Sequence, residues 1–374
     1  MILSDVCEFI VDCPHSTAPD EGEGYPLIRT PNVGKGRLDL NGVHRVSESV
    51  YKQRIQRGAP RANDLIFARE APAGNVALVQ ENQTVCLGQR TVLIRPNVQK
   101  VNPQYLVYYL LSPKPQYELL GTANGATVAH VNLPAIRNLK IELPEKSVQD
   151  KIGTILVTYD NLIENNQKQI KLLEEAAQRL YKEWFVDLRF PGHENTKIVD
   201  GVPEGWSRTN INEILTFHRG YDLTKNEMKA GRYPVVGSTT VIGYHNEFKI
   251  KGPGIVTGRS GSLGKYQFIW DNFWPHNTSL YISDYKDHNI FFVYSLLQTV
   301  DFASLNNGGA IPTLNRNVLS NIEVIEPTDE LQEMFAKIAE PQYQKIKNLE
   351  KQNDRLKTAR DLLLPKLMSG EVEV

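Results

Sequence analysis

The sequence of 374 residues contains one pattern twice. Residues 124–185 align without a gap on residues 307–368, at a constant shift of 183 positions, so that Pro144 falls on Pro327. The units of a solenoid have about 20–50 residues, and this period is far longer. We therefore predict two copies of a whole domain, each followed by a long helix, related by a pseudo-twofold axis.

The repeat continues upstream, where the shift changes. Pro26-Leu27 matches Pro234-Val235 at a shift of 208, whereas Phe67–Gly74 matches residues 257–264 at a shift of 190. The first copy therefore carries 18 additional residues (208 − 190) between Leu27 and Phe67. Insertions of this kind are typical of surface loops, which lengthen without uncovering a core. We expect the copies to share a scaffold and to present different surfaces.

Length and composition limit the class of protein. A chain of this length suits two domains with connectors, and no run approaches the roughly 18 apolar residues of a membrane span. The N-terminus does not have the pattern of a signal peptide. The three cysteines all lie in the first copy without a C-x-x-C motif, which favours a reducing, cytoplasmic environment and no metal site. We expect no cofactor.

Charge is balanced overall and uneven locally. The net charge is −1, but residues 25–70 hold nine Arg or Lys against four acids, and residues 219–265 hold eight against three. Each stretch therefore has a net charge of +5, at the same place in both copies. This is consistent with a polyanion-binding face, although solvated surface charge is the alternative.

The two copies and the segments that follow them differ in their predicted secondary structure. Short β-rich runs cut by Gly, Pro and Asn fill the copies, and a helix is expected from Asn102 with Pro103 in its first turn. Two long helices follow the copies, and Asn166 and Asn353 are polar exceptions in their apolar seams. The seam positions of the first helix are Leu156, Ile163, Ile170, Ala177 and Trp184, with Ile152, Tyr159, Leu173 and Leu180; those of the second are Phe335, Ile346, Leu349, Leu356 and Leu363.

These patterns predict an α+β fold: two tandem mixed α/β domains separated by two long helices that pair as an antiparallel coiled coil. The expected boundaries are residues 1–145 for the first domain, 146–192 for the first helix, 198–327 for the second domain and 328–374 for the second helix. A helical rod of about 55 Å would hold two basic surfaces apart, as successive groove faces of a DNA duplex require.

Several motifs resemble those of the specificity subunits of type I restriction–modification systems. Residues 172–193 resemble the central conserved region of that family, and Leu362–Glu371 resembles its distal conserved region. Pro203-Glu204-Gly205-Trp206 is similar to the family's lead into a recognition domain. The resemblance covers nearly the whole chain; one departure is that the first copy lacks this lead and starts at Ile2-Leu3.

The resemblance implies a non-catalytic subunit that binds double-stranded DNA. Each copy would be a target-recognition domain for one half of a bipartite site, and the helices would set the spacer. Two methyltransferase subunits and, in the restriction form, two motor-nuclease subunits would be the partners. The alternatives are a coiled-coil protein-interaction scaffold without a DNA role and a self-contained methyltransferase.

Motifs for catalysis are weak. Asn102-Pro103-Gln104-Tyr105 resembles the Asn-Pro-Pro-Tyr motif of adenine methyltransferases but lacks the second proline, so a helix cap is favoured. The three glycines Gly258, Gly261 and Gly264 suggest a turn between strands rather than a phosphate-binding loop.

Candidate binding residues come from the two basic stretches. Arg69 and Arg259 share one position in the repeat and are expected to contact phosphate, with a structural arginine paired to a carboxylate as the alternative. The candidate base readers are Arg29, Asn32, Lys35, Arg37 and Arg45 in the first copy, and Arg219, Tyr221, Ser238, Tyr244 and His245 in the second. Four aromatic residues at the end of the first helix are candidates for subunit docking, with packing against the second domain as the alternative: Tyr181, Trp184, Phe185 and Phe190.

Overall fold

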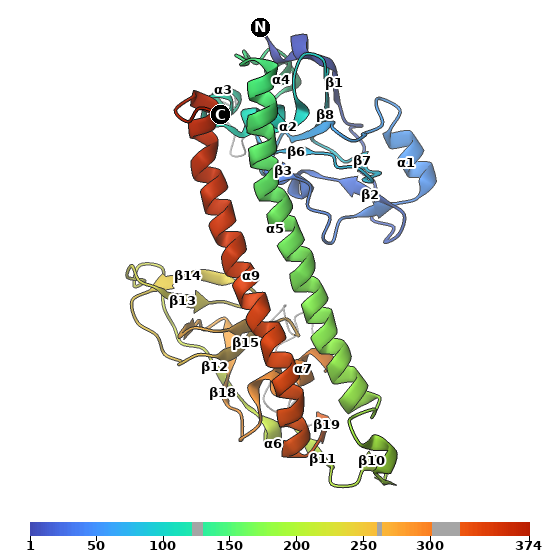
Figure 1. Ribbon diagram of the computed structural model, residues 1–374, viewed down its shortest axis with the longest axis vertical. Helices are drawn as coiled ribbons and strands as arrows, with labels where there is room; N and C mark the ends of the chain where they lie inside the picture. The colour runs from blue at the N-terminus through green and yellow to red at the C-terminus, as the bar shows by residue number, and fades with distance from the viewer. Residues whose placement is uncertain (122–129, 260–263, 301–321) are drawn as a thin grey trace. The chain divides into compact units, whose positions relative to one another are not determined.

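The computed structural model describes residues 1–121, 130–259, 264–300 and 322–374 of the chain. The chain divides into two compact units, one formed by Met1–Asn166 with Gln352–Val374 and the other by Gln167–Lys351. The two long helices are α5 (Lys146–Tyr181), which continues as a π-helical turn over Lys182–Val186, and α9 (Asp329–Ser369). Each unit therefore contains one copy of the repeat and a stretch of both helices (Figure 1).

The first unit is built on a five-stranded sheet in the order β1-β8-β5-β6-β3. All neighbours are antiparallel except β3 and β6, which are parallel. A second, three-stranded sheet has the order β4-β2-β7. The strands are β1 (Cys7–Asp12), β2 (Tyr25–Ile28), β3 (Gly36–Arg37), β4 (Arg45–Val46), β5 (Leu65–Ala68), β6 (Val76–Leu78), β7 (Cys86–Leu87) and β8 (Thr91–Pro96).

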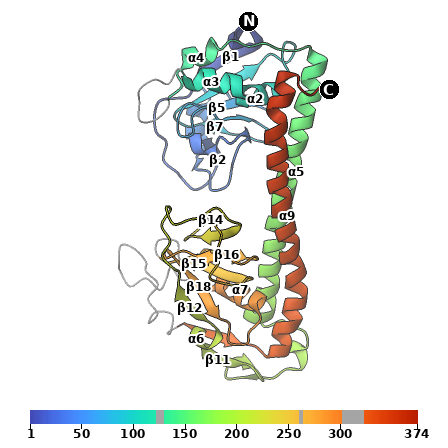
Figure 2. The same cartoon turned by 90° about the vertical axis from the view of Figure 1, so that its left-hand side faces the viewer.

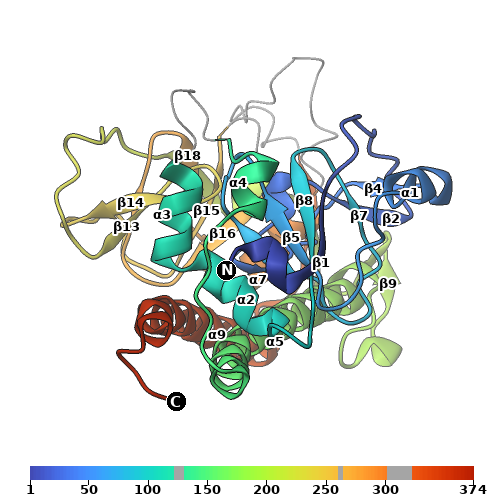
Figure 3. The same ribbon diagram turned by 90° about the horizontal axis from the view of Figure 1, so that it is seen from above.

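Helix α2 connects the large sheet of this unit to the long helices. One face of α2 packs on the sheet residues Phe67 and Ile94, and the same core includes Ile152 and Leu156 of α5 (Figure 3). The Asn102 side chain accepts a hydrogen bond from the Tyr105 main-chain nitrogen, so the predicted cap is confirmed. The helices of the unit, besides α5 and α9, are α1 (Glu48–Arg54), α2 (Pro103–Leu111), α3 (Pro113–Gly121) and α4 (Leu133–Arg137).

The second unit repeats this arrangement. Its larger sheet has the order β12-β18-β15-β16, and a three-stranded sheet has the order β14-β13-β17. Helix α7 packs between the larger sheet and the long helices, as α2 does in the first unit (Figure 2). The elements are β9 (Ile198–Val199), β10 (Val202–Pro203), β11 (Ser207–Asn210), α6 (Ile211–Ile214), β12 (Thr216–Arg219), β13 (Tyr233–Val236), β14 (Val241–His245), β15 (Gly254–Gly258), β16 (Tyr266–Ile269), β17 (Trp274–Pro275), β18 (Ser279–Asp284), α7 (Ile290–Thr299) and β19 (Glu323–Glu326).

The two strand orders confirm the duplication. Strands β1, β8, β5 and β6 correspond to β12, β18, β15 and β16, and the parallel pair β2–β7 corresponds to β13–β17. A hydrogen bond is repeated as well: Gln149 donates to the Pro144 carbonyl at 2.9 Å, and Gln332 donates to the Pro327 carbonyl at 3.1 Å. The insertion of the first copy is more than a loop, because it supplies the edge strand β3 and the helix α1.

The long helices pair antiparallel, as predicted. In the first unit Asn166 on α5 donates to Asn353 on α9 at 2.9 Å, and Asp160 pairs with Arg360, so the numbering rises along one helix and falls along the other. In the second unit Ala177 of α5 shares a core with Ile346 of α9. Helix α9 lies within the range of residues 328–374 that was expected for the second helix, and it continues through Pro365 to Ser369. None of the described helices is long and apolar enough to span a membrane.

Candidate nucleic-acid interface

The β13–β14 hairpin gives the second unit an exposed edge with mixed chemistry. Tyr244 is 58% exposed, and the apolar side chains of Val241, Ile242 and Phe248 are exposed beside it. The two strands pair with a β-bulge between Val235 and Val236, which increases the local twist of the hairpin. Exposed apolar side chains can contact thymine methyl groups, and tyrosine adds a hydroxyl for hydrogen bonding.

A lysine lies over aromatic rings behind this hairpin. The Lys249 ammonium is 4.7 Å from the centroid of the Trp274 ring and 5.8 Å from that of Tyr221. The Tyr221 hydroxyl lies 3.0 Å from the Tyr281 hydroxyl, so Tyr221 is held in place and only partly exposed. This cation–π arrangement keeps one positive charge at a defined position on the surface.

His245 is buried rather than presented to a ligand, contrary to the prediction that it reads bases. Its ring is 5% exposed, packs edge-on against Trp274, and lies 3.0 Å from the main-chain nitrogen of Lys229. The reason is strand alternation: Tyr244 and His245 are neighbours on β14, so their side chains point to opposite faces.

The remaining candidates of the second unit lie near the ends of strands. Arg219, the last residue of β12, is exposed and its guanidinium lies 3.8 Å from Asp222. Ser238 donates to the Thr278 carbonyl at 2.7 Å. Arg259 follows β15, and its main-chain nitrogen bonds to the Thr278 carbonyl, as that of Arg69 bonds to Arg90 in the first copy. The turn that was expected at Gly258, Gly261 and Gly264 falls partly outside the described residues, because Gly261 is not among them.

The candidates of the first unit lie around the insertion. Lys35 is exposed, next to a cavity of about 220 Å³, and Arg29 is partly exposed. Arg45 is partly exposed and donates to the Gly24 carbonyl at 2.7 Å. Asn32 is buried and was predicted wrongly as a base reader, because its side chain accepts from the Arg29 main chain and donates to the Asp39 carbonyl.

Two arginines of the first unit are tied to other parts of the protein. Arg37 donates to Asn161 of α5 at 2.6 Å, and its guanidinium lies 3.9 Å from Glu164. Arg69, 11% exposed at its side chain, pairs with Asp12 at 2.7 Å and donates to the Val131 carbonyl at 2.9 Å. These contacts favour the structural alternative for Arg69.

A buried carboxylate of α5 holds the loop that carries Lys35 and Arg37. Asp160 accepts hydrogen bonds from the Tyr108 hydroxyl and from Arg360 of α9, both at 2.5 Å. Gly36 packs on the same group, since a Cβ at this position would come within 2.7 Å of the Asp160 oxygen. Burial and the adjacent Asp160 carboxylate raise the pKa of Tyr108 well above its usual range, which keeps the hydroxyl protonated as the donor. The helix pair therefore positions the loop that carries Lys35 and Arg37.

The four predicted docking aromatics form the core of the second unit instead, which corrects that expectation. Tyr181, Trp184, Phe185 and Phe190 are between 2% and 7% exposed. The Phe185 ring lies 5.3 Å from Phe292 of α7 and 5.9 Å from Trp206. They are buried because the second domain covers this end of α5, as the packing alternative required.

The sequence did not reveal two features of this candidate interface. Lys249 stands out only through the rings of Trp274 and Tyr221, which come from other segments, so no local pattern marks it. The sequence gives a weak indication of the Asp160–Arg360 ion pair. Asp160 follows the seam residue Leu156 by four positions, and Arg360 follows the seam residue Leu356 by the same number.

Comparisons with known proteins identify the family. The model of the type I restriction modification DNA specificity domain matches residues 1–175 and 203–358. The MjaIX type I restriction enzyme specificity subunit of Methanocaldococcus jannaschii is 27% identical over 364 residues, which are 89% of this chain and 83% of that protein. The HindI specificity subunit of Haemophilus influenzae is 23% identical over 404 residues, which are 84% of this chain and 87% of that protein.

The fold has a solved counterpart as well. The crystal structure of a type I restriction–modification S subunit from M. genitalium superposes with a TM-score of 0.60 at 19% identity, over 98% of this chain and 95% of that one. The family model matches well over half of the residues, once for each copy of the repeat. The chain thus belongs to the type I restriction modification DNA specificity domain family.

Proposed function

We propose that this chain is the specificity subunit of a type I restriction–modification complex, in which each unit reads one half of a bipartite DNA target. The observation that carries the proposal is the duplication of one α+β scaffold with divergent surfaces, within a family defined by DNA specificity. A shared scaffold explains a common docking mode on the duplex, and divergent loops explain two different half-sites.

The domain boundaries follow the same division of labour. We assign residues 1–145 and 198–327 as target-recognition domains, and residues 146–192 and 328–374 as the helices that set the spacer. Support comes from the long helices α5 and α9, which start at Lys146 and Asp329. Relatives of the chain are themselves called specificity subunits, so two methyltransferase subunits and, in the restriction form, two motor-nuclease subunits are the proposed partners. Catalysis belongs to those partners.

The exposed polar and basic side chains are the proposed DNA contacts. In the first unit these are Arg29, Lys35 and Arg45; in the second they are Arg219, Ser238 and Tyr244, with Lys249 added by its position over Trp274. Arg259 is the proposed phosphate contact. Arginine pairs with guanine and tyrosine with base edges or sugar, so these residues supply both register and readout.

Methylome sequencing tests the proposal directly. The chain is expressed with its methyltransferase in a host without other adenine methylation, and residues 198–327 are exchanged for those of another family member. The expected result is a bipartite methylated motif of which only one half changes. A motif that is unchanged, or that changes in both halves, would contradict the division of labour. Loss of all methylation together with retained complex formation would instead support the protein-interaction scaffold.

A further inference from the structure

We propose that the helix pair takes part in target recognition, with Asp160 and Asn161 of α5 as positioning residues for the half-site of the first unit. They act through the loop of residues 33–38, called here the Lys35 loop, which presents Lys35 to the DNA. This role rests on the proposed function and extends it, since the helices then contribute to specificity as well as to the spacer. The residues involved all belong to the first unit.

The Lys35 loop is a tight turn at the edge of the large sheet. Val33 and Leu38 form an antiparallel bridge, and the Gly34 main-chain nitrogen donates to the Arg37 carbonyl at 3.0 Å. Strand β3 in this loop forms the edge of the sheet and pairs in parallel with β6 over two residues. An edge strand this short has few main-chain bonds, so its position depends on the side chains that pack against it.

Helix α5 meets the loop at Gly36. The backbone there has a φ of +91°, which favours glycine, and a Cβ would come within 2.7 Å of an Asp160 oxygen and 3.2 Å of the Tyr108 ring. The main chain of the loop therefore packs directly against the Asp160 carboxylate. Asp160 is 3% exposed and accepts hydrogen bonds from Tyr108 of α2 and Arg360 of α9. Side chains from two other helices thus fix the group on which the loop packs.

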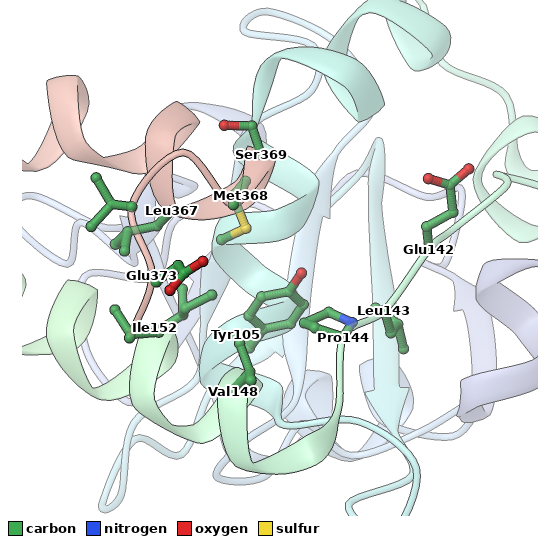
Figure 4. A pocket seen from close by; sticks show the side chains of 13 residues that line it. Tyr105, Glu142, Leu143, Pro144, Val148, Ile152, Leu367, Met368, Ser369 and Glu373 are labelled. Atoms are coloured by element: carbon green, nitrogen blue, oxygen red, sulfur yellow. The ribbon is translucent and has the colours of Figure 1, made fainter.

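These three helices are fixed to one another by the core of the first unit. Tyr105 of α2, Ile152 of α5 and Leu367 of α9 belong to this core, and they lie together around a cavity of about 580 Å³ (Figure 4). The Asp160 carboxylate is therefore carried by packed helices rather than by a loop. Contact residues are held most closely when their supporting side chains are locked in this way.

Arg37 ties the Lys35 loop to the next residues of α5. Its guanidinium donates to the Asn161 side chain at 2.6 Å and lies 3.9 Å from Glu164, and its side chain is 18% exposed. Lys35 differs, because it is exposed and its ammonium has no partner among the residues that the structure describes. The loop thus uses Arg37 to bind α5 and leaves Lys35 as the cation that it presents.

The main chain of Lys35 has to be held closely if this side chain reads a base. A lysine has a flexible stem, so its main chain limits where the ammonium can reach. A binding contact has to be kept within about 0.5 Å of its productive geometry. Lys35 shares the wall of the cavity of about 220 Å³ with Tyr108 and Arg360, so the loop has space to shift when its contacts to α5 are lost. Loss of these contacts should therefore relax base selection.

The second unit differs at the corresponding place. The shift of 183 puts Tyr343 at the position of Asp160, and the shift of 186 puts Tyr294 at that of Tyr108. The Tyr343 ring stacks on Phe268 of β16 with centroids 6.0 Å apart, and it lies 5.4 Å from the Tyr294 ring. Aromatic packing on the larger sheet thus replaces the polar contact to a loop. Substitutions at Asp160 or Asn161 should therefore change only one half-site.

Methylation rates of defined duplexes test the role of Asn161. The chain is purified with its methyltransferase subunits, and rates are compared for the intact bipartite target and for targets with a substituted base pair in one half-site or the other. The half-site of the first unit is the half that persists when residues 198–327 are exchanged. We expect Asn161→Ala to lower the preference for the intact first half-site severalfold and to leave the preference for the second unchanged.

Three further variants separate positioning from loss of stability. Asn161→Asp keeps an acceptor for the Arg37 guanidinium and should retain the wild-type preference. Asn165→Ala, at another exposed asparagine of α5, is the matched control. Asp160→Asn replaces one acceptor oxygen of the buried group by a donor, and we expect it to lower the first preference about tenfold. Asn161 is exposed, so its substitution keeps the test decisive if Asp160→Asn does not fold.

Hydrogen exchange of the Lys35 loop gives a measurement without DNA. The Gly34 amide is bonded to the Arg37 carbonyl, so its protection depends on how firmly the loop is held. Mass spectrometry of the full-length chain should show faster exchange of residues 33–38 in Asn161→Ala and Asp160→Asn than in the wild type and in Asn165→Ala.

The outcomes distinguish this role from the proposed function. Loss of stability alone lowers all methylation rates by the same factor, whereas positioning changes their ratio for the first half-site. Unchanged ratios, an equal change in both half-sites, or unchanged exchange of the loop would overturn the role of Asp160 and Asn161, and a bipartite wild-type target would still leave the proposed function standing. A wild-type complex that methylates no bipartite target would overturn both.

Discussion

The carboxylate of Asp160 on α5 accepts a 2.5 Å hydrogen bond from the guanidinium of Arg360 on α9, and both side chains lie inside the first unit. The repeat places Tyr343 and Ala177 at the corresponding positions of the second unit, so the same site is apolar there. If α5 of another molecule replaced α9, Ala177 would stand opposite Asp160 and leave the charge without a counter-ion. The ion pair thus selects α9 as the partner of α5.

Removing the cation of this pair should destabilise the protein strongly. Arg360→Ala leaves the Asp160 carboxylate buried without a counter-ion, which costs about 3–5 kcal/mol. Adding Asp160→Asn removes the buried charge and should recover part of the loss. Thermal and urea unfolding measure both effects, with the exposed Arg355→Ala as control. A midpoint for Arg360→Ala equal to that of the control would argue against a buried, energetically important pair.

Substitutions of Asn166 and Asn353 should have coupled effects on the free energy of unfolding. Asn353→Ile alone leaves Asn166 without its 2.9 Å partner and should cost about 1–3 kcal/mol of unfolding free energy. The second unit has Leu349 and Ile170 at the corresponding positions, so adding Asn166→Leu copies its apolar contact and should restore stability. A double-mutant cycle from urea unfolding measures the coupling; strictly additive losses would show that the two amides do not interact.

A phosphate contact should be visible in the salt dependence of DNA binding. Arg259→Ala in the complex with methyltransferase subunits should lower the slope of log K against log salt by about 1, because one fewer counterion is released. Lys171→Ala on the exposed surface of α5 is the matched charge control. Filter binding or anisotropy at several salt concentrations gives the slopes. Equal slopes for the two variants would exclude Arg259 as a phosphate contact.

A substitution in the β13–β14 hairpin of the second unit should change the recognition of only one half-site. Tyr244→Ala removes the most exposed ring of β14 and should relax or change one half of the methylated motif, with a loss of about 1–3 kcal/mol for the correct sequence. Tyr117→Ala, at a still more exposed tyrosine on α3 of the first unit, is the control. Methylome sequencing reads both halves at once, and a change in the half-site of the first unit would contradict the assignment.

The thiols of the first unit should be unreactive while the protein is folded. Burial raises the pKa of Cys7 to about 12 and of Cys86 to about 11. Only the thiolate reacts with iodoacetamide, so at pH 8.5 alkylation should be much slower in buffer than in urea. Mass spectrometry of the peptides resolves the two positions, and equal rates in buffer and urea would contradict the burial.

The same pKa shifts give a sign for stability against pH. The folded pKa values lie above the unfolded value near 8.5–9, so the folded state retains protons that the unfolded chain releases. The contribution of these thiols is therefore fully present below about pH 8.5 and is lost as the pH rises towards 11–12.

Much of the architecture could be predicted because the repeat and the seams are periodic. Asn166 and Asn353 were placed in the seam from heptad spacing, and the structure joins them. The cap at Asn102 followed from one local motif. The α9 helix continues through Pro365 to Ser369, because the packing of Leu364 and Leu367 in the first core outweighs the poor helix propensity of proline.

The candidate site was less predictable because surface chemistry depends on long-range neighbours. Asn32, His245 and Arg69 have the side chains of DNA readers. Yet Asn32 is bonded within its own loop, His245 points to the buried face of its strand, and Arg69 pairs with the distant Asp12. Trp184 and Phe185 look like a docking patch in the sequence and are core residues in the structure, since the second domain that covers them is not visible in a helical pattern.

The division of the chain has a consequence for its synthesis. The second unit is one uninterrupted stretch, Gln167–Lys351, whereas the first needs Gln352–Val374 from the far end. Leu367 of its core leaves the ribosome last, after every residue of the second unit. The half that is translated first is therefore the half that matures last, and the nascent N-terminal domain has to wait, with the apolar face of α5 uncovered, for the closing turns of α9.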